Sequence, residues 1–322
     1  GSGPCIYESQ ISGERMEFKA NKDYYLKTPQ WDRFVVKVVA TPSLLSGLMN
    51  DEIDILAGNV ASLQLSDWDM AKQQQNLTCV STESVGYQYM AINTEKDYLP
   101  PKVRQAIDMA INRDAIVSGL LKGEGEPAFG PFATSHKYYD DVVNVGYNPE
   151  KAKELLAEAG YPDGFEVTLD APNDRYMNDE QIAQAVAGYL EKVGIKVNLN
   201  LMPKANFFSY IKPLENKSMF LMTGWSDASG DGLSLMHDML YTYDREAGNG
   251  GVNRGHYSNA QVDALIDQAF TEMDDTKRGE LVAEADKIAR EDYAYIPLHF
   301  EQDTYAIKDT LNYTPRMNKY VY

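Results

Sequence analysis

The sequence predicts an α/β fold with mixed sheets, and two observations carry that prediction. Apolar and polar residues alternate in "FEVTLDAP" (165–172) and in "IKVNLNL" (195–201), which is the period of a strand. Between these runs, segment 180–194 repeats apolar residues at intervals of three and four and stops at Gly194, as an amphipathic helix does. A strand, a helix and a strand joined by short turns form a right-handed crossover with parallel strands.

Short strand-like runs precede this crossover. Residues 5–40 hold several of them, separated by Gly and Pro breaks, as in a mixed sheet. A short helix and a short buried strand are expected within 43–56. The run "VGYQYMAINT" (85–94) is a further strand, and its Tyr87 and Tyr89 share one face because successive strand residues point to opposite sides.

The helices outside the crossover have recognisable ends. Asn148 is a side-chain cap, Pro149 takes the first helical position, and Gly160 stops that helix. Ser258 and Gln261 have the spacing of a capping box at the start of a later helix. The expected helices are 103–121, 148–160, 258–273 and 277–292, followed by a strand at 294–300 and a Tyr-rich tail.

The charge and cysteine content exclude several classes of partner. Lys and Arg number 30 against 48 Asp and Glu, and this net charge of −18 would repel a nucleic-acid backbone. No run approaches the length of about 18 apolar residues that a transmembrane helix needs. Cys5 and Cys79 lie too far apart in sequence for a metal-ligand motif. They either form one disulfide or, as we favour, remain buried free thiols.

Enzyme signatures are missing from the sequence. The four histidines lie far apart without zinc-binding spacing, and no G-x-S-x-G elbow or phosphate-binding glycine motif occurs. Asp227 and Asp231 would suit glycoside hydrolysis as paired carboxylates, but in so acidic a chain such a pair is more often solvated turn residues. We therefore predict a protein that is not an enzyme and that needs no cofactor.

The segment "GWSDASGDGLSLMHDML" (224–240) admits three interpretations: a plain turn, a calcium loop, or the polar wall of a ligand cleft. Asp227, Ser229 and Asp231 occupy positions one, three and five of a calcium-binding loop. Position twelve, however, is Asp238 instead of Glu, and the preceding residues read as a strand instead of the entering helix. We therefore predict no metal site.

Trp225 favours the cleft interpretation, although a Trp beside a turn also often closes the edge of a core. Its ring ends an apolar strand, where it can stack on a ligand. The glycine-rich turn exposes backbone N–H groups, and Asp227, Ser229 and Asp231 can receive hydroxyl or amino groups. Aromatic walls with a few fixed polar groups are typical of ligand pockets.

Seven stretches of the chain form a recognisable series. They are "GSGPCIYE", "MNDEIDIL", "AINTEKDYLPPKVRQAIDMAINRDAIV", "YNPEKAKELLAEAGYPDGFEVTL", "GWSDASGDG", "NRGHYSNAQVDALIDQA" and "IPLHF". With them the chain resembles the large periplasmic solute-binding proteins of peptide-type ABC transporters, which include dipeptide-, oligopeptide- and glutathione-binding receptors. The resemblance covers essentially the whole chain, and it implies a two-lobed, type II-like periplasmic binding protein fold.

The resemblance also implies how the chain is divided. Residues 1–92 and 299–322 would belong to the first lobe, and 93–298 would form the second lobe, which carries most of the ligand-side loops. The chain would cross between lobes near Asn93 and His299. Because members of the family are longer, the resemblance implies that an N-terminal portion is missing.

Several site residues follow from the resemblance. In the dipeptide receptors an Arg grips the ligand carboxylate, and "APNDRYMND" places Arg175 at that position, with Tyr176 beside it. An Asp of the Trp-containing loop holds the peptide amino group in those receptors, and here Ala228 stands in its place, with Asp227 one residue earlier. That departure weakens the case for an ordinary peptide held by its α-amine.

Further contacts complete this set. Tyr87, Tyr89 and Asn93 are expected as secondary ligand contacts, although one of the two tyrosines should pack in the core.

The function implied is capture without chemistry. A small peptide, or a peptide-like or opine-like solute, would favour the closed form of the two lobes, and the closed receptor would deliver it to the permease of an ABC importer. The location would be the periplasm or the outer face of the cell membrane, with membrane association only through the permease or a lipid anchor. A glycoside- or oligosaccharide-binding receptor of the same family, or a hydrolase using Asp227 and Asp231, are the alternatives.

Overall fold

The computed structural model forms two compact units. Its description extends over residues 2–56, 63, 65–134, 136–138, 145–211, 218–227 and 229–315. One unit comprises Gly1–Val80 with Thr304–Pro315, and the other comprises Ser81–Asp303. The chain passes between the units within two long strands, β5 (Leu77–Ile92) and β10 (Tyr295–Lys308). The two units therefore divide inside these strands, whereas the lobes that the resemblance implies, with crossings near Asn93 and His299, remain a prediction.

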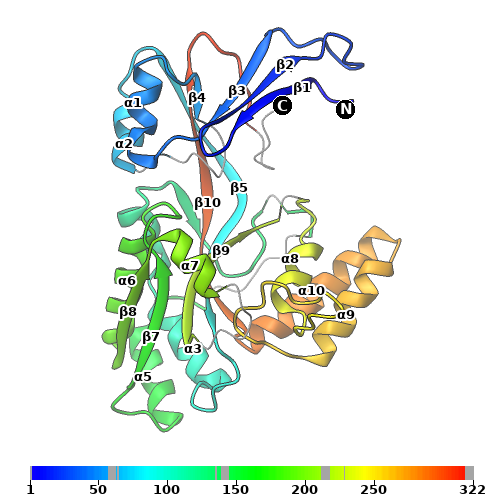
Figure 1. Ribbon diagram of the computed structural model, residues 1–322. Coiled ribbons are helices and arrows are strands. Elements are labelled where there is room, and N and C mark those ends of the chain that lie inside the picture. Colours follow the sequence, from blue (N-terminus) through cyan, green and yellow to red (C-terminus); the bar gives the residue numbers. More distant parts are fainter. Residues whose placement is uncertain are drawn as a thin grey trace. The chain divides into compact units, whose positions relative to one another are not determined.

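The first unit contains a three-stranded antiparallel sheet and two short helices (Figure 1). Its elements are β1 (Cys5–Ile11), β2 (Arg15–Ala20), β3 (Arg33–Lys37), α1 (Leu44–Met49), β4 (Ile55–Leu56) and α2 (Leu65–Ala71). The early strands and the short helix and strand of 43–56 agree with the sequence-based expectation. Cys5 and Cys79 are free thiols, both half-buried.

The second unit is built around the larger mixed sheet. The strands of this sheet lie in the order β4-β10-β5-β9-β7-β8, of which β4 belongs to the first unit, and β6 pairs with β10. The remaining strands are β6 (Gly125–Pro127), β7 (Phe165–Pro172), β8 (Ile195–Met202) and β9 (Phe220–Ser226). β7 and β8 are parallel, and α6 (Asp179–Glu191) connects them, so the predicted crossover is confirmed.

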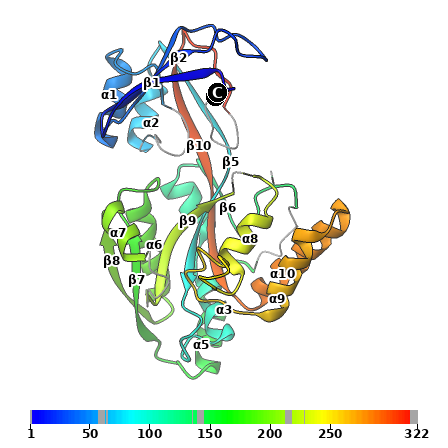
Figure 2. The same ribbon diagram turned by 45° about the vertical axis from the view of Figure 1, so that its right-hand side comes forward.

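Helices cover both faces of this sheet (Figures 1 and 2). On β5, Met90 and Ile92 enter one core and Tyr87, Tyr89 and Ala91 enter the other, as strand alternation requires. The first core is covered by helices that include α3 (Pro101–Ala110), α5 (Pro149–Glu158) and α6. The second core is covered by α7 (Lys204–Ile211), α8 (Leu233–Leu240), α9 (Ala260–Thr271) and α10 (Asp275–Glu291).

The predicted continuous helix over 103–121 is wrong. α3 stops at Ala110, and a new start follows with α4 (Arg113–Ala115) and a π-helical turn, η3 (Ile116–Leu120). Asn112 causes the restart because its side chain accepts a hydrogen bond from the Ala115 N–H at 2.9 Å.

The other helix ends follow the predicted signals with one exception. Asn148 accepts from the Lys151 N–H at 2.9 Å, and Pro149 opens α5 as expected. α9 is capped by Asn259, not by Ser258, whose hydroxyl instead lies 2.9 Å from that of Thr242. No described helix is long and apolar enough to span a membrane.

Candidate ligand-binding site

The loop between β9 and α8 is organised by Asp227. Its Oδ1 accepts hydrogen bonds from the Ser229 N–H and hydroxyl at 2.9 and 2.6 Å and from the Ser234 hydroxyl at 2.9 Å. Its Oδ2 accepts from the Gly232 N–H at 2.7 Å. Burial raises the pKa of Asp227, but these hydrogen bonds outweigh it and hold the pKa below its ordinary value. The observed task of this carboxylate is therefore to shape the loop.

Asp231 has a similar local role at the start of α8. Its Oδ1 accepts from the Leu233 N–H at 2.9 Å and from the Ser229 hydroxyl at 3.2 Å. Gly232 has a φ of 84°, and a Cβ there would lie 2.5 Å from the Phe132 ring. Only a glycine fits this turn, because the conformation is left-handed and the aromatic ring blocks a side chain.

The carboxylate oxygens that a calcium loop would use already accept hydrogen bonds. Both oxygens of Asp227 and Oδ1 of Asp231 accept from donors of the loop itself. Within the described ranges, no group of three His, Cys, Asp or Glu residues could hold a metal ion. Ala228, the position of the family's amine-binding Asp, lies outside the described residues.

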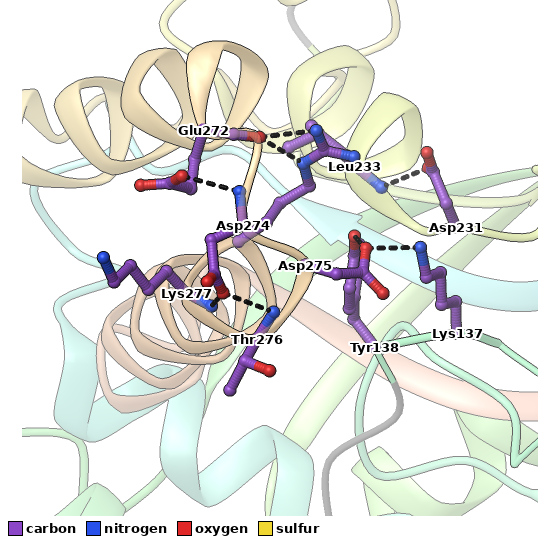
Figure 3. A network of polar contacts seen from close by, with 10 residues as sticks. Lys137, Tyr138, Asp231, Leu233, Glu272, Asp274, Asp275, Thr276 and Lys277 are labelled. Atoms are coloured by element: carbon purple, nitrogen blue, oxygen red, sulfur yellow. Dashed lines mark hydrogen bonds and ion pairs between the residues drawn. The ribbon is translucent and has the colours of Figure 1, made fainter.

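The turn between α9 and α10 supports this loop from one side. Figure 3 draws Asp231 and Leu233 of the loop together with residues of that turn, and the Lys137 N–H donates to the Gly230 carbonyl of the loop at 3.0 Å. There Asp275 accepts hydrogen bonds from the Lys137 ammonium at 2.5 Å and from the Tyr138 hydroxyl at 2.9 Å. The segment before α5 and the α9–α10 turn are thereby joined beside the loop.

His136 belongs to the same surroundings, and the sequence analysis did not select it. Its ring is buried, and its Nδ1 accepts from the Ala133 N–H at 3.0 Å. Burial lowers the pKa of His136, while the charges of Asp227 and Asp231 act in the opposite direction. No spacing in the sequence signals this proximity.

Trp225 ends β9 beside the aromatic core. It is half-buried, and it is the cross-strand partner of Tyr87 on β5. Tyr87 is fully buried, its ring stacks on Tyr89 at 5.2 Å, and its hydroxyl lies 2.9 Å from the Met239 sulfur. Tyr87 and Tyr89 are therefore both core residues, and the ligand contact expected of Tyr87 remains a prediction.

Asn93 forms a turn at the end of β5. It is buried, its side chain accepts from the Glu95 N–H at 3.0 Å, and its own N–H donates to the Met219 carbonyl at 3.0 Å. These contacts give Asn93 a local structural role, and the ligand contact expected of it remains a prediction.

The loop between β7 and α6 brings Arg175 and Tyr176 to β9. Asp179 fixes the loop because its Oδ2 accepts from the backbone N–H groups of Arg175 and Tyr176 at 2.8 and 2.9 Å. The Tyr176 hydroxyl then accepts from the Gly224 N–H at 3.0 Å and lies 3.3 Å from the Thr223 hydroxyl. Burial raises the pKa of Tyr176, so its hydroxyl stays protonated.

Arg175 is held over the ring of its neighbour. Its guanidinium carbon lies 4.7 Å from the Tyr176 ring centroid, and the side chain is half-buried. Among the described residues no carboxylate forms an ion pair with Arg175. The structure thus unites Arg175, Tyr176 and the β9 strand that carries Trp225.

Two polar residues missed by the sequence analysis complete this cluster. Gln88 of β5 is buried, and its side-chain N–H donates to the Glu301 carboxylate of β10 at 2.6 Å. Gly224 makes room for it, because a Cβ at Gly224 would lie 2.3 Å from the Gln88 nitrogen. A Gln within the apolar run "VGYQYMAI" was the available signal.

The chain was compared with known proteins. The family model of bacterial extracellular solute-binding proteins, family 5 Middle, matches residues 1–247. Heme-binding protein A of Haemophilus influenzae is 28% identical over 308 residues, covering 92% of this chain and 54% of that protein. Di/tripeptide-binding protein 1 of Pseudomonas aeruginosa is 30% identical over 310 residues, covering 92% and 55%. The chain thus spans about half the length of these relatives.

A solved structure shows the same fold. The periplasmic binding protein DppA of Helicobacter pylori, in complex with the peptide STSA, matches with a TM-score of 0.84 at 22% identity, covering 99% of this chain and 62% of that one. These findings confirm the resemblance to peptide-type solute-binding proteins and the predicted α/β fold of the type II periplasmic binding proteins. The family description also agrees with the extracytoplasmic location expected from the sequence.

Proposed function

This chain belongs to the family 5 bacterial extracellular solute-binding proteins, and from that premise we propose that it captures a small peptide, or a peptide-like or opine-like solute, for an ABC importer. The receptor would release the solute to the permease after the two predicted lobes, 1–92 with 299–322 and 93–298, close on it. The two relatives are named for different ligands, heme and di/tripeptides. We therefore infer the class of ligand from the residues of the site.

The observation that carries the proposal is the placement of Arg175. Its guanidinium rests on the Tyr176 ring, and Tyr176 is itself anchored to Gly224 of β9. A planar cation held in place without a carboxylate partner from the described residues suits a carboxylate of the ligand, which it can bind with two parallel hydrogen bonds. This feature favours an anionic or zwitterionic solute over a neutral oligosaccharide.

Binding without turnover also fits the loop after β9. The family consists of binding proteins. A hydrolase would need the carboxylates of Asp227 and Asp231 at the reacting atoms, whereas they accept hydrogen bonds from the loop. We therefore assign these residues, with Ser229, to shaping the wall of the site, and Trp225 to its apolar surface.

The test is direct. The purified full-length protein is incubated with a tryptic peptide hydrolysate, and retained peptides are identified by native mass spectrometry together with the thermal shift. Stabilisation with peptides recovered unchanged is the expected result, since a ligand that binds only the folded state raises its melting temperature. Hydrolysed peptides would indicate an enzyme, and no retention would reject peptide capture.

A further inference from the structure

α8 and α9 expose part of an aromatic cluster at the surface of the second unit. The His237 ring lies 5.3 Å from the Tyr241 ring and 5.5 Å from the Phe270 ring, measured between centroids. Phe270 is 51% exposed, and Met273 follows it three residues later in the chain. We call these four residues the α8–α9 surface. Adjoining exposed apolar side chains are typical of a surface that a partner covers.

Met273 lies in the turn of the hairpin that α9 and α10 form side by side (Figure 1). Its side chain is 87% exposed, and no other large apolar residue of the described ranges is exposed to that extent. The turn itself is ordered, because the Asp274 side chain caps α10 and the Arg278 guanidinium donates to the Glu272 carbonyl at 3.0 Å. A partner would therefore meet a thioether on a backbone that is already in place, which lowers the entropic cost of binding.

Carboxylates border the α8–α9 surface. Residues 237–275 contain eight Asp and Glu against two Arg. The Tyr241 hydroxyl donates to Asp267 at 3.0 Å, and the Thr242 N–H donates to Asp263 at 2.9 Å. Burial raises the pKa of Tyr241, and the charges of Asp267, Asp263 and Asp244 raise it further, which shows that these three carboxylates gather around one hydroxyl.

The negative charge of this border is not cancelled within the protein. Asp263 and Asp267 accept from neutral donors, and Glu272 accepts from the Asp274 N–H at 2.7 Å. Over the described ranges, none of Asp244, Asp263, Asp267, Glu272 and Asp274 forms an ion pair. Elsewhere many carboxylates are paired, such as Glu158 with Lys102 and Glu166 with Lys196. The surface therefore offers an apolar centre within a negative rim.

This surface is distinct from the candidate ligand site. The start of α8 at Leu233 adjoins the β9–α8 loop, whereas His237 and Tyr241 belong to the other end of that helix. None of the four residues of the α8–α9 surface has a contact with Arg175 or Trp225 among those described above. Changes on the surface should therefore leave ligand binding intact.

We propose that the α8–α9 surface docks on the permease, through a basic region that sets Arg or Lys side chains against the carboxylates and a pocket over Met273 and Phe270. The inference rests on the proposed function, which supplies the permease as partner, and adds the contact surface. A negative rim speeds the encounter with a cationic partner, and a central apolar anchor supplies much of the affinity. A nucleic acid or an anionic lipid surface would be repelled by the same charges.

The experiment measures binding of the full-length receptor to the permease of the same importer, reconstituted in phosphatidylcholine nanodiscs, by biolayer interferometry. Met273→Ser should raise the dissociation constant about 10-fold, because it removes the apolar anchor. Asp267→Asn combined with Glu272→Gln should slow association several-fold at low salt and weaken its salt dependence. Both amides keep an oxygen for the existing donors, so the fold should persist, which circular dichroism checks.

Matched controls come from other surfaces. Met70→Ser changes a methionine of the first unit that is 49% exposed. Glu150→Gln combined with Glu158→Gln removes two exposed carboxylates from α5. Neither control should change permease binding. The thermal shift with a retained peptide is measured for every variant, and it should equal that of the wild-type protein.

The outcomes separate docking from peptide capture. Unchanged permease binding in both surface variants overturns docking at the α8–α9 surface, as does a wild-type receptor that does not bind the nanodiscs, and both results leave peptide capture standing. A wild-type receptor that binds the permease but retains no peptide rejects peptide capture alone. Light scattering tests a second copy as the occupant: a wild-type dimer that Met273→Ser dissociates would assign the surface to self-association and overturn docking on the permease.

Discussion

The Tyr176 hydroxyl accepts a hydrogen bond from the backbone N–H of Gly224 at 3.0 Å, although 48 residues separate the two in the chain. This bond fastens the β7–α6 loop to β9 just before Trp225. It places the Arg175 guanidinium, which rests on the same ring, at a fixed position relative to the sheet. The predicted carboxylate contact thus depends on the hydrogen bond of a neutral phenol whose ring carries the Arg175 guanidinium.

We expect Tyr176→Phe to weaken both folding and binding. The change leaves the Gly224 N–H without its acceptor, and an unsatisfied buried donor costs about 1–3 kcal/mol. Urea unfolding measures this loss of stability, and calorimetry measures binding of a retained peptide. Tyr243→Phe, which removes an exposed hydroxyl, is the control. A Tyr176→Phe protein as stable as that control would show that the Gly224–Tyr176 hydrogen bond does not stabilise the fold.

Arg175→Ala should weaken binding of a carboxylate-bearing ligand by about 1.5–3 kcal/mol, the range for a hydrogen bond to a charged group. Arg175→Lys should weaken binding by less than Arg175→Ala does, because an ammonium keeps the charge but cannot offer the two parallel donors of a guanidinium. Lys192→Ala provides a matched control, since Lys192 lies over the Tyr189 ring at 4.8 Å in a similar stacked geometry. Calorimetry measures the binding free energy of each variant. A change below a few tenths of a kcal/mol for Arg175→Ala would show that Arg175 does not bind the ligand.

Asp227→Ala should destabilise the protein by about 2–4 kcal/mol, because it strips acceptors from two backbone N–H groups and two hydroxyls in one buried loop. Asp238→Ala, on the neighbouring helix α8, provides a comparison at a half-exposed carboxylate. Thermal unfolding gives both values. If the two variants unfold at the same temperature, Asp227 does not organise the loop.

Removal of divalent metal should leave the melting temperature unchanged. Both carboxylate oxygens of Asp227 and Oδ1 of Asp231 are hydrogen-bonded within the β9–α8 loop. Differential scanning fluorimetry with and without a chelator tests this, and re-addition of calcium serves as the control. A drop in melting temperature with chelator that calcium restores would revive the calcium interpretation.

Local patterns predicted the parts of the fold that local interactions determine. The β7–α6–β8 crossover was predictable because the alternation of apolar and polar residues in its strands and the helical period between them occur within 38 residues, counted from Phe165 to Met202. The single helix over 103–121 was wrong because α3 ends at Ala110 and the Asn112 side chain caps a new start. Arg113, at that start, also donates to the Pro297 carbonyl at 2.8 Å, a contact 184 residues away that no local pattern contains.

The same limit applies to the candidate site. Arg175, Tyr176 and Trp225 were predicted from motifs, and the structure brings the segments that carry them together. Gln88 and Glu301 are 213 residues apart in sequence, so their hydrogen bond could emerge only when β5 and β10 pair. Strand alternation placed Tyr87 and Tyr89 on one face of β5, but it could not show that helices cover that face and bury both rings.

Acid should destabilise the protein through His299, a neighbour of the candidate site on β10. Burial lowers the pKa of His299 from 6.5 to about 4, so the folded state resists protonation. Above pH 6.5 the ring is neutral in both states and contributes nothing. As the pH falls from 6.5 to 4, the unfolded chain binds the proton first, and stability decreases by about 3 kcal/mol in total. Below this window the loss is complete.

His299→Gln should flatten the stability profile over that window, because its side chain does not titrate. Urea unfolding at intervals from pH 7.5 to 4, relative to wild type, measures the difference, and His237→Gln on the half-exposed face of α8 controls for loss of a histidine as such. Other acidic groups cancel in this subtraction, since both proteins share them. A variant with the wild-type slope would show that His299 exchanges its proton as readily in the folded state as in the unfolded chain.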